Sequence, residues 1–526
     1  MSKEDNRAYM LEKVNELRSQ EEKIRQGGGL KMIERQHSLN KLTAWERIER
    51  LVDPGTFYDI DALAKSPATA FGMDKRETPA EGVICGYGKI AGREVVVYAS
   101  DFTVMAGSFG EGTLVKVNKA LELGGKMGIP VVGLIDSAGA RLEESRESVY
   151  AFGRLFCLHS IYSGVVPQIS ALMGPCVAGQ AYSPVLADFL LMVKGTSYMW
   201  LASPILTKVA TGEEVTNEEL GGSDVHMKKS GSCDLVAEND DDCLEKIKRL
   251  LSFLPQNYKE SPSLVDTKDD PNRREESLLE VLPVNPRAAY DIRQIIYKVV
   301  DNGDFLELKP DYARNIVIGF GRLNGRTVGI VANQPMVMAG GMEPDCSDKY
   351  TKFITICDAY NIPLITFVDT TAFLPGKHYE EIGVLRHGAK ILHAYSVTTV
   401  PKIQLIIRRC YGGANMVMGS KGMGADLCIA WPTAEISFTG AEGAVAIFYR
   451  KQIAQATNPE EERKKLEEEY FKEKIQVYAH AEAVRHGVVD TVIDPRDTRP
   501  TLIKALELLS TKKESRPERR RAIPPV

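Results

Sequence analysis

Val-Val-Tyr-Ala-Ser-Asp-Phe-Thr-Val-Met-Ala-Gly, residues 96–107, returns as Gly-Ile-Val-Ala-Asn-Gln-Pro-Met-Val-Met-Ala-Gly at residues 329–340. The two copies lie 233 residues apart, since 340 minus 107 is 233. Further blocks follow in the same order: 128–136 matches 361–369 at the same offset, and 167–173 and 176–179 match 401–407 and 410–413 at an offset of 234. This period is too long for a solenoid repeat, so the sequence indicates the duplication of one whole domain.

The composition is that of an ordinary globular protein with room for two cores, with 526 residues, 44% hydrophobic and 26% charged. A net charge of −5 gives no electrostatic footprint for nucleic acid, and the basic tail at 516–521 is interpreted as solvated. The nine cysteines lack metal-site spacing, and the polar start lacks the apolar core of a signal peptide. We therefore expect a cytoplasmic protein without a disulfide framework or a metal site.

Each half alternates apolar, β-branched runs with helical stretches, which is typical of α/β units. In the first half we expect strands at 131–135 and 169–173 and helices at 145–160 and 181–193. Exposed helices are expected at 8–26 and 459–476. A charged, proline-rich segment, 261–286, is expected to link an N-terminal domain, 1–260, to a C-terminal domain, 287–526.

Two Gly-rich turns, 174–181 and 410–415, each follow a short buried strand and precede a helical run. Small residues let a ligand approach the backbone, and the free N–H groups at a helix start present partial positive charge. The turns are candidate oxyanion holes. The structural alternative is a tightly packed strand-to-helix turn with no ligand, which their equivalent repeat positions disfavour.

The loops 107–111 and 136–141 are further candidates for ligand contact. Taken alone, Asp136 and Arg141 are more often a local ion pair than catalytic groups, and His387 is more often structural than a general base. The sequence shows no paired-carboxylate spacing, Gly-Xaa-Ser-Xaa-Gly elbow, Walker loop or zinc pattern, which disfavours Walker-type phosphate chemistry.

These segments resemble the carboxyltransferase (β) subunits of biotin-dependent acyl-CoA carboxylases, with the propionyl-CoA carboxylase branch closest. The similar segments, from about residue 27 to residue 450 and beyond, include 27–29, 36–37, 41–47, 101–104, 167–170, 174–176, 182–184, 332–335, 373–376, 386–390 and 430–432. The resemblance implies an α/β fold of two tandem duplicated crotonase-like (ClpP-like) domains. It also implies a homo-hexamer with active sites between an N-domain and a C-domain of different subunits, where acyl-CoA lies on the first domain and carboxybiotin arrives over the second.

The resemblance further implies that backbone N–H groups hold two oxyanions. Ala178 and Gly179 would face the thioester oxygen, and Gly413 and Ala414 the biotin ureido oxygen. Carboxybiotin supplies CO2 and the biotin anion takes the α-proton, so no side-chain base is required. The other implied substrate- and biotin-binding residues are Gly107, Ser108, Ser137, Ala138, Gly139, Ala140, Arg141, Phe373, Asn415 and Met416.

The sequence has no Ala-Met-Lys-Met-like biotinylation site and no ATP-grasp domain. We therefore expect biotin on a separate biotin carboxyl carrier protein. The carrier would be served by a separate biotin carboxylase subunit, or by membrane decarboxylase subunits.

Several positions depart from the propionyl branch. Asn415-Met416 replaces Tyr-Asp after Gly-Gly-Ala, 370–373 replaces Val-Pro-Gly, Ala178 replaces a glycine and Glu143 a common glutamine. An alanine still offers its N–H, so the oxyanion role survives. The exchange of a carboxylate for the apolar Met416 favours a different acyl group.

Three other functions remain open from the sequence. The nearest is the α-subunit of a biotin-dependent decarboxylase acting on methylmalonyl-CoA or glutaconyl-CoA and coupled to a membrane sodium pump. A biotin-independent crotonase-type enzyme would need a carboxylate next to the α-carbon of the substrate. The repeat gives no support for placing Glu143 or Glu144 at that position. A non-catalytic scaffold would keep the fold for assembly alone.

Overall fold

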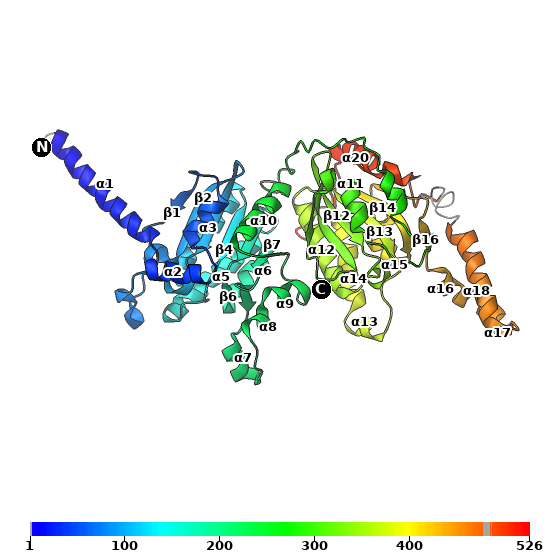
Figure 1. The fold of residues 1–526 in the computed structure, drawn as a ribbon, viewed down its shortest axis with the longest axis horizontal. Coiled ribbons are helices and arrows are strands. Elements are labelled where there is room, and N and C mark those ends of the chain that lie inside the picture. Colours follow the sequence, from blue (N-terminus) through cyan, green and yellow to red (C-terminus); the bar gives the residue numbers. More distant parts are fainter. Residues whose placement is uncertain (1–2, 477–483, 485, 526) are drawn as a thin grey trace. The chain divides into compact units, whose positions relative to one another are not determined.

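The structure is a computed structural model that describes residues 3–476, 484 and 486–525 (Figure 1). The chain divides into two compact units, Met1–Glu260 and Ser261–Val526. Each unit is built on one large mixed sheet. Of the helices that the structure describes, none has the length and apolarity needed to cross a bilayer.

The sheet of the first unit has seven strands, antiparallel along one edge and parallel elsewhere. In spatial order they are β1 (Tyr58–Ile60), β2 (Val83–Ile90), β3 (Arg93–Ser100), β4 (Val131–Ile135), β5 (Gln168–Leu172), β7 (Phe189–Val193) and β9 (Leu235–Ala237). A separate parallel pair is formed by β6 (Pro175–Val177) and β8 (Tyr198–Trp200). Every residue of β4, β5 and β7 is buried, because helices cover both faces of the parallel strands.

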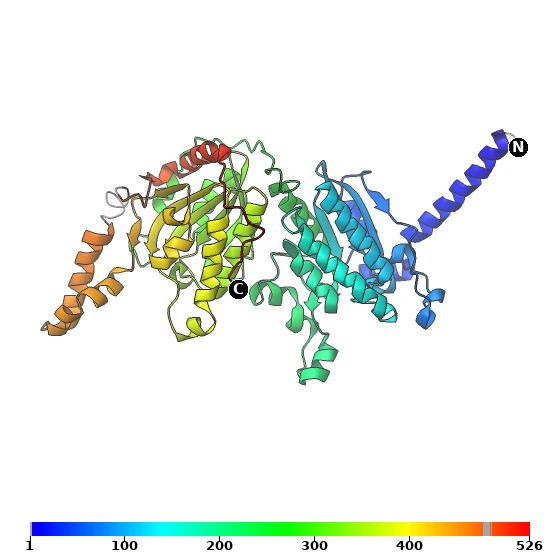
Figure 2. The same ribbon diagram turned by 180° about the vertical axis from the view of Figure 1, so that it is seen from behind.

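Helices pack on both faces of this sheet. Figure 1 shows α3 (Ala44–Leu51) and α10 (Asp240–Phe253) over one face, and Figure 2 shows α4 (Glu111–Met127) and α5 (Ser145–Tyr162) over the other. Leu114 of α4 and Leu155 of α5 share a core with Val96 of β3. The remaining α-helices of this unit are α1 (Lys3–Arg25), α2 (Leu30–Ser38), α6 (Tyr182–Leu186), α7 (Pro204–Thr211), α8 (Asn217–Gly221) and α9 (Ser223–Lys228).

The second unit repeats this sheet in strand order and in strand direction. Its strands are β10 (Phe305–Leu308), β11 (Ile316–Leu323), β12 (Arg326–Asn333), β13 (Leu364–Thr370), β14 (Lys402–Tyr411), β15 (Leu427–Ala430) and β17 (Thr491–Val492), with β16 (Glu435–Ser437) paired to the end of β14. The expected α/β fold of duplicated units is confirmed.

Two groups of helices flank the second sheet. Ile295 of α11 (Arg293–Val299) and Leu502 of α20 (Thr498–Leu508) share a core with Ile330 of β12. On the other face α12 (Pro344–Ala359) comes so close that a Cβ at Gly329 would meet the Cys357 sulfur. The other α-helices of this unit whose ends both lie within the described residues are α13 (Lys377–Glu381), α14 (Val384–Val397), α15 (Gly412–Val417), α16 (Ala441–Phe448), α17 (Arg450–Gln455) and α18 (Pro459–Tyr470).

One expectation from the sequence needs correction. The helix expected at 181–193 ends as α6 at Leu186, and 189–193 is strand β7, because a short apolar run does not distinguish a buried strand from a buried helix. Residues 261–286, expected to be a linker, are grouped with the second unit, where Leu278 and Val281 are buried in the core. The exposed helices expected at 8–26 and 459–476 correspond to α1, and to α18 followed by a π-helical turn at 471–476.

The duplicated block keeps an unusual backbone conformation in both units. Residues 105–107 have φ angles of 47°, 53° and 61°, and residues 338–340 have 48°, 52° and 74°. A Cβ at Gly107 would lie 2.2 Å from the carbonyl oxygen of Asp136, and one at Gly340 would lie 2.2 Å from that of Asp369. Glycine is therefore required at both positions by conformation and by space.

We expect Gly107→Ala to lower the thermal unfolding midpoint more than Gly195→Ala. Both residues have positive φ, but a Cβ at Gly195 would have no atom within 4 Å, so that variant bears only a left-handed strain of roughly 1 kcal/mol. Gly107→Ala must also move the backbone at Asp136. Thermal melts followed by circular dichroism measure the difference, and equal shifts for the two variants would contradict the close approach.

Candidate functional site

The carboxyl ends of β3, β4 and β5 bring the candidate loops of the first unit together. The Ala138 N–H donates to the Ala106 carbonyl (3.0 Å), and the Ser137 N–H donates to the Pro175 carbonyl (2.7 Å). The Phe109 N–H donates to the Gly139 carbonyl (2.8 Å). The loops at 105–109 and 137–141 and the turn after β6 therefore form one hydrogen-bonded backbone assembly, at the sheet edge where open α/β folds bind ligands.

The Gly-rich turn of the first unit, 174–181, contains β6 and continues directly after it. Ala178 has a φ of 56°, a left-handed conformation that is uncommon for a residue with a Cβ. It opens a short 3₁₀ helix, Ala178–Ala181, whose first N–H groups have no acceptor within the helix. Among the residues that the structure describes, and apart from its neighbours along the chain, none has an atom within 4 Å of a Cβ position on Gly179. Backbone donors and open space therefore occur together at Ala178 and Gly179.

The second unit builds the corresponding turn at the end of β14. Gly412 has a φ of 53°, and a Cβ there would lie 2.8 Å from the Phe438 carbonyl oxygen. Gly413 follows in the first turn of α15, exposed, and the nearest atom to a Cβ there is Cδ2 of Phe373, at 3.7 Å. The Phe373 ring also lies 3.1 Å from a Cβ position on Gly388 of α14. Phe373 thus lies between α14 and the Gly-rich turn.

The two predicted donor pairs are not in register with one another. At the offset of 234, Ala178 corresponds to Gly412 and Gly179 to Gly413, so the pair Gly413 and Ala414 begins one residue later than the pair Ala178 and Gly179. Ala414 has a buried side chain, and its N–H belongs to the first turn of α15. Gly179 and Gly413 are therefore the equivalent positions.

Three of the predicted binding residues turn their side chains into the protein. Arg141 is 1% exposed, and its Nη1 donates to carboxylate oxygens of Glu81 and Glu144, both at 2.7 Å. Its Nη2 donates to the Ser108 carbonyl, and the Ser137 hydroxyl accepts from the Gly139 N–H. These side chains hold the loops in place, whereas Ala138 is exposed and Ala140 half-buried. Arg141 and Asp136 therefore do not form the local ion pair that the sequence suggested as an alternative.

Asp136 and Asp369, which occupy equivalent positions, are fully buried. Asp136 accepts from Lys41 (2.7 Å), Arg47 (3.0 Å) and Gln36 (2.8 Å). Burial lowers the pKa of Lys41, although the Asp136 carboxylate opposes that shift. Asp369 accepts from Arg408 (3.0 Å) and Arg409 (2.7 Å). The repeat alone could have drawn attention to both carboxylates.

A buried lysine at equivalent positions of the two units donates to main-chain carbonyls. Lys116 donates to the carbonyls of Ala80 and Val83, and Lys349, at an offset of 233, donates to those of Lys309, Tyr312 and Ile316. Burial lowers the pKa of Lys349 to about 7. Sequence reasoning missed both lysines because their acceptors are main-chain atoms.

The remaining candidates lie on α15 and α14. The Asn415 amide oxygen accepts from Gln404 (3.4 Å), and Met416 is 47% exposed. His387 lies 2.9 Å from the Asp348 carboxylate, which also accepts from Lys390. His387 therefore belongs to a local ion-pair cluster. In the described part of the chain, no three His, Cys, Asp or Glu side chains are placed to hold a metal ion.

A chain of neutral hydrogen bonds anchors α6 behind the turn at Ala178. The Ser183 hydroxyl lies 2.7 Å from Nε2 of His159, and Nδ1 of His159 lies 2.6 Å from the Gln168 amide oxygen. The Gln168 amide nitrogen donates to the His159 carbonyl. Burial lowers the pKa of His159 to about 4, so the imidazole stays neutral and can accept from Ser183.

We expect His159 to make folding sensitive to mild acid. Between pH 6.5, the ordinary value for histidine, and pH 4, the unfolded chain binds a proton that the folded chain does not. The contribution of the neutral His159 to the free energy of unfolding is therefore complete above pH 6.5. Below that pH it falls by up to roughly 1.4 kcal/mol per pH unit. Unfolding measured from pH 7 to pH 4.5 should show a shallower acid slope for His159→Asn than for the wild type. His378→Asn, at an exposed position, should keep the wild-type slope, and identical slopes for all three proteins would refute the assignment.

Comparisons with known proteins extend over nearly the whole chain. The family model described as "Carboxyl transferase domain" matches residues 35–523. The methylmalonyl-CoA decarboxylase subunit alpha of Propionigenium modestum is 47% identical over 508 residues, which cover 97% of this chain and 98% of that protein. The propionyl-CoA carboxylase carboxyltransferase subunit of Haloferax mediterranei is 46% identical over 511 residues, with 97% and 98% covered.

Among solved structures, transcarboxylase 12S is 44% identical to this chain, with a TM-score of 0.94 over 98% of both chains. That structure is described as a hexamer assembly with methylmalonyl-coenzyme A and methylmalonic acid bound.

Proposed function

This chain belongs to the carboxyl transferase family, as a carboxyltransferase of the biotin-dependent acyl-CoA carboxylases, and from this premise we propose how it works. It transfers a carboxyl group between carboxybiotin on a separate carrier protein and the α (or vinylogous) carbon of a short acyl-CoA such as propionyl-CoA. One observation carries the proposal. Each unit presents backbone N–H groups beside open space at the same end of a duplicated sheet, at Gly179 and at Gly413.

The turn at Ala178 and Gly179 is the proposed site for the thioester oxygen. Negative charge develops on that oxygen as the α-carbon becomes an enolate, and fixed N–H donors stabilise it without reorganising. The hydrogen bonds among the loops at 105–109 and 137–141 and the strand β6 hold the backbone still. Arg141, Ser108 and Ser137 act here as positioning residues.

The turn at Gly413 and Ala414 is the proposed site for the ureido oxygen of biotin. Carboxybiotin, when bound, supplies the CO2 and the base for the α-proton. The chain's own contribution is to accept a flat polar group against the N–H donors, where Gly413 leaves room and the Phe373 ring borders the space. The residues present therefore fit the group that the family uses.

The proposed partners follow from the family. A biotin carboxyl carrier protein brings the biotin, and a biotin carboxylase subunit charges it. Because the similar transcarboxylase 12S is described as a hexamer assembly, we propose a homo-hexamer for this chain as well.

Decarboxylation is the second candidate reaction, favoured by the 47% identity to a methylmalonyl-CoA decarboxylase subunit alpha. The identity to a propionyl-CoA carboxylase subunit is 46%, so similarity alone does not decide the direction. The same two turns would serve both directions, because the enolate and the biotin anion occur in each. If the chain serves decarboxylation, membrane decarboxylase subunits would replace the biotin carboxylase, and turnover in the assembled complex would require sodium.

The donor role of Gly413 can be tested by removing its backbone N–H group. Gly413→Pro removes the N–H at a helix position that tolerates proline, whereas Gly413→Ala keeps the N–H and adds a Cβ only 3.7 Å from Phe373, an ordinary contact. We expect Gly413→Pro to lower kcat for carboxyl transfer by about 10²–10³-fold and Gly413→Ala to retain most of the activity. Equal activity of the two variants would exclude the Gly413 N–H as a donor.

The substrate is tested with the purified chain and free biotin or an added carrier. Transfer is followed to and from acetyl-, propionyl-, crotonyl-, methylcrotonyl-, methylmalonyl- and glutaconyl-CoA. We expect turnover of a short-chain ester, and we expect Met416→Asp, which restores the residue of the propionyl branch, to shift the preference among the esters. Binding of CoA esters without transfer from any of them would overturn the proposed reaction.

A further inference from the structure

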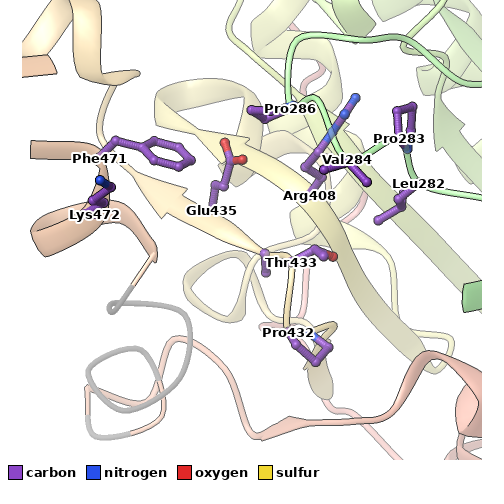
Figure 3. A pocket seen from close by; sticks show the side chains of 11 residues that line it. Leu282, Pro283, Val284, Pro286, Arg408, Pro432, Thr433, Glu435, Phe471 and Lys472 are labelled. Atoms are coloured by element: carbon purple, nitrogen blue, oxygen red, sulfur yellow. The ribbon is translucent and has the colours of Figure 1, made fainter. Parts of the chain in front are cut away.

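A pocket that is separate from the two Gly-rich turns lies in the second unit, where β14 ends and β16 begins (Figure 3). Its volume is about 470 Å³. Arg408 and Thr433 supply polar groups, Leu282 and Phe471 supply apolar walls, and Val284 lies exposed at the rim. Figure 3 shows Arg408 beside Val284 and Leu282, with Glu435 and Phe471 on the opposite side. None of the residues assigned to the two Gly-rich turns is among its described lining residues.

One terminal nitrogen of the Arg408 guanidinium group, Nη2, donates no hydrogen bond to the described residues. The residue is 3% exposed, its Nε donates to Asp369 (3.0 Å), and its Nη1 donates to the Ala288 carbonyl (3.0 Å). The group also lies over the Tyr290 ring, 5.1 Å from its centroid. Nη2 is buried and has no hydrogen-bond partner among the described residues. A buried donor without an acceptor is unfavourable, so an acceptor entering the pocket would relieve that cost.

The charges around the pocket favour an anion. Asp369 is shared by Arg408 and Arg409, so two guanidinium groups face one carboxylate. Lys472 adds a further positive charge at the exposed rim. Glu435 is the negative neighbour; its carboxyl group accepts from the Tyr411 hydroxyl, and burial raises its pKa.

The shape of the pocket narrows the ligand class. A guanidinium edge matches a planar carboxylate, which it can bind through parallel N–H donors. Small-molecule sites of this size are mostly apolar with a few convergent polar groups, and the walls of Leu282 and Phe471 suit an aliphatic tail. We propose that this pocket binds a short aliphatic monocarboxylate, with its carboxylate on Nη2 of Arg408 and its tail against these walls.

The experiment measures binding of propionate to the full-length protein by saturation-transfer NMR and titration calorimetry. For a ligand this small we expect saturable binding with a Kd on the order of 1 mM, and at least about tenfold weaker binding of the uncharged 1-propanol. Propionate that fails to saturate, or 1-propanol that binds as well, would overturn the proposal. Because the measurement is of binding, its outcome is independent of carboxyl transfer.

A matched pair of variants locates the binding. Val284 is fully exposed at the rim, so Val284→Asp adds a negative charge without disturbing the core, and Leu508→Asp adds the same charge at an exposed position on α20. We expect Val284→Asp to weaken propionate binding by roughly tenfold and Leu508→Asp to leave it unchanged. Equal binding by the two variants would place the propionate elsewhere and refute the site.

Arg408→Lys supplies a second test at the anchor itself. The lysine keeps a positive charge for Asp369 but lacks Nη2, so propionate binding should be lost. The thermal unfolding midpoint should also fall, because the hydrogen bond of Nη1 to the Ala288 carbonyl is lost. Undiminished binding by a folded Arg408→Lys protein would refute the role of Nη2. If this variant does not fold, the comparison of Val284→Asp with Leu508→Asp decides.

Discussion

One buried aspartate in each unit, Asp136 and its equivalent Asp369, is the constraint on which the loop assemblies depend. A carboxylate without solvent contact persists only if cations and hydrogen bonds replace the water it has lost. The carbonyl of the same residue lies where the side chain at Gly107 or Gly340 would otherwise be. In each unit this aspartate therefore does two things. Its carboxylate requires buried cations as partners, and its carbonyl oxygen requires glycine at position 107 or 340.

The two units neutralise this aspartate with cations from different parts of the chain. In the second unit Arg408 of β14 does so directly. The first unit has Gly174 at the equivalent position, since 408 minus 174 is 234, and a Cβ there would lie 1.8 Å from an Asp136 carboxylate oxygen. The vacated space admits Lys41 and Arg47, so the segment after α2 becomes part of the first unit's core. Removing that segment would leave a buried carboxylate unpaired.

The sequence predicted features whose physical cause is local. The duplicated sheet follows from the repeat, whose blocks recur in the same order at offsets of 233 and 234. It did not predict that Arg141 pairs with Glu81 and Glu144, because ion pairs between loops depend on how distant segments pack. The strand at 189–193 was missed because both a buried strand and a buried helix can be apolar throughout. The offset of 234 also shows that the two donor pairs implied by family resemblance start at different repeat positions.

A site made from backbone N–H groups explains how one duplicated domain can serve two different ligands. The φ angles at 105–106 and 338–339 differ by only 1° in each pair, although the surrounding side chains have diverged. Any residue except proline supplies the same donor, so the proposed oxyanion function would tolerate the exchange of glycine for alanine at 178. With alanine at 178, the left-handed backbone conformation is strained by roughly 1–2 kcal/mol. The flanking hydrogen bonds must offset this strain. Selectivity is then left to neighbouring side chains such as Phe373 and Met416, which can change without disturbing the donors.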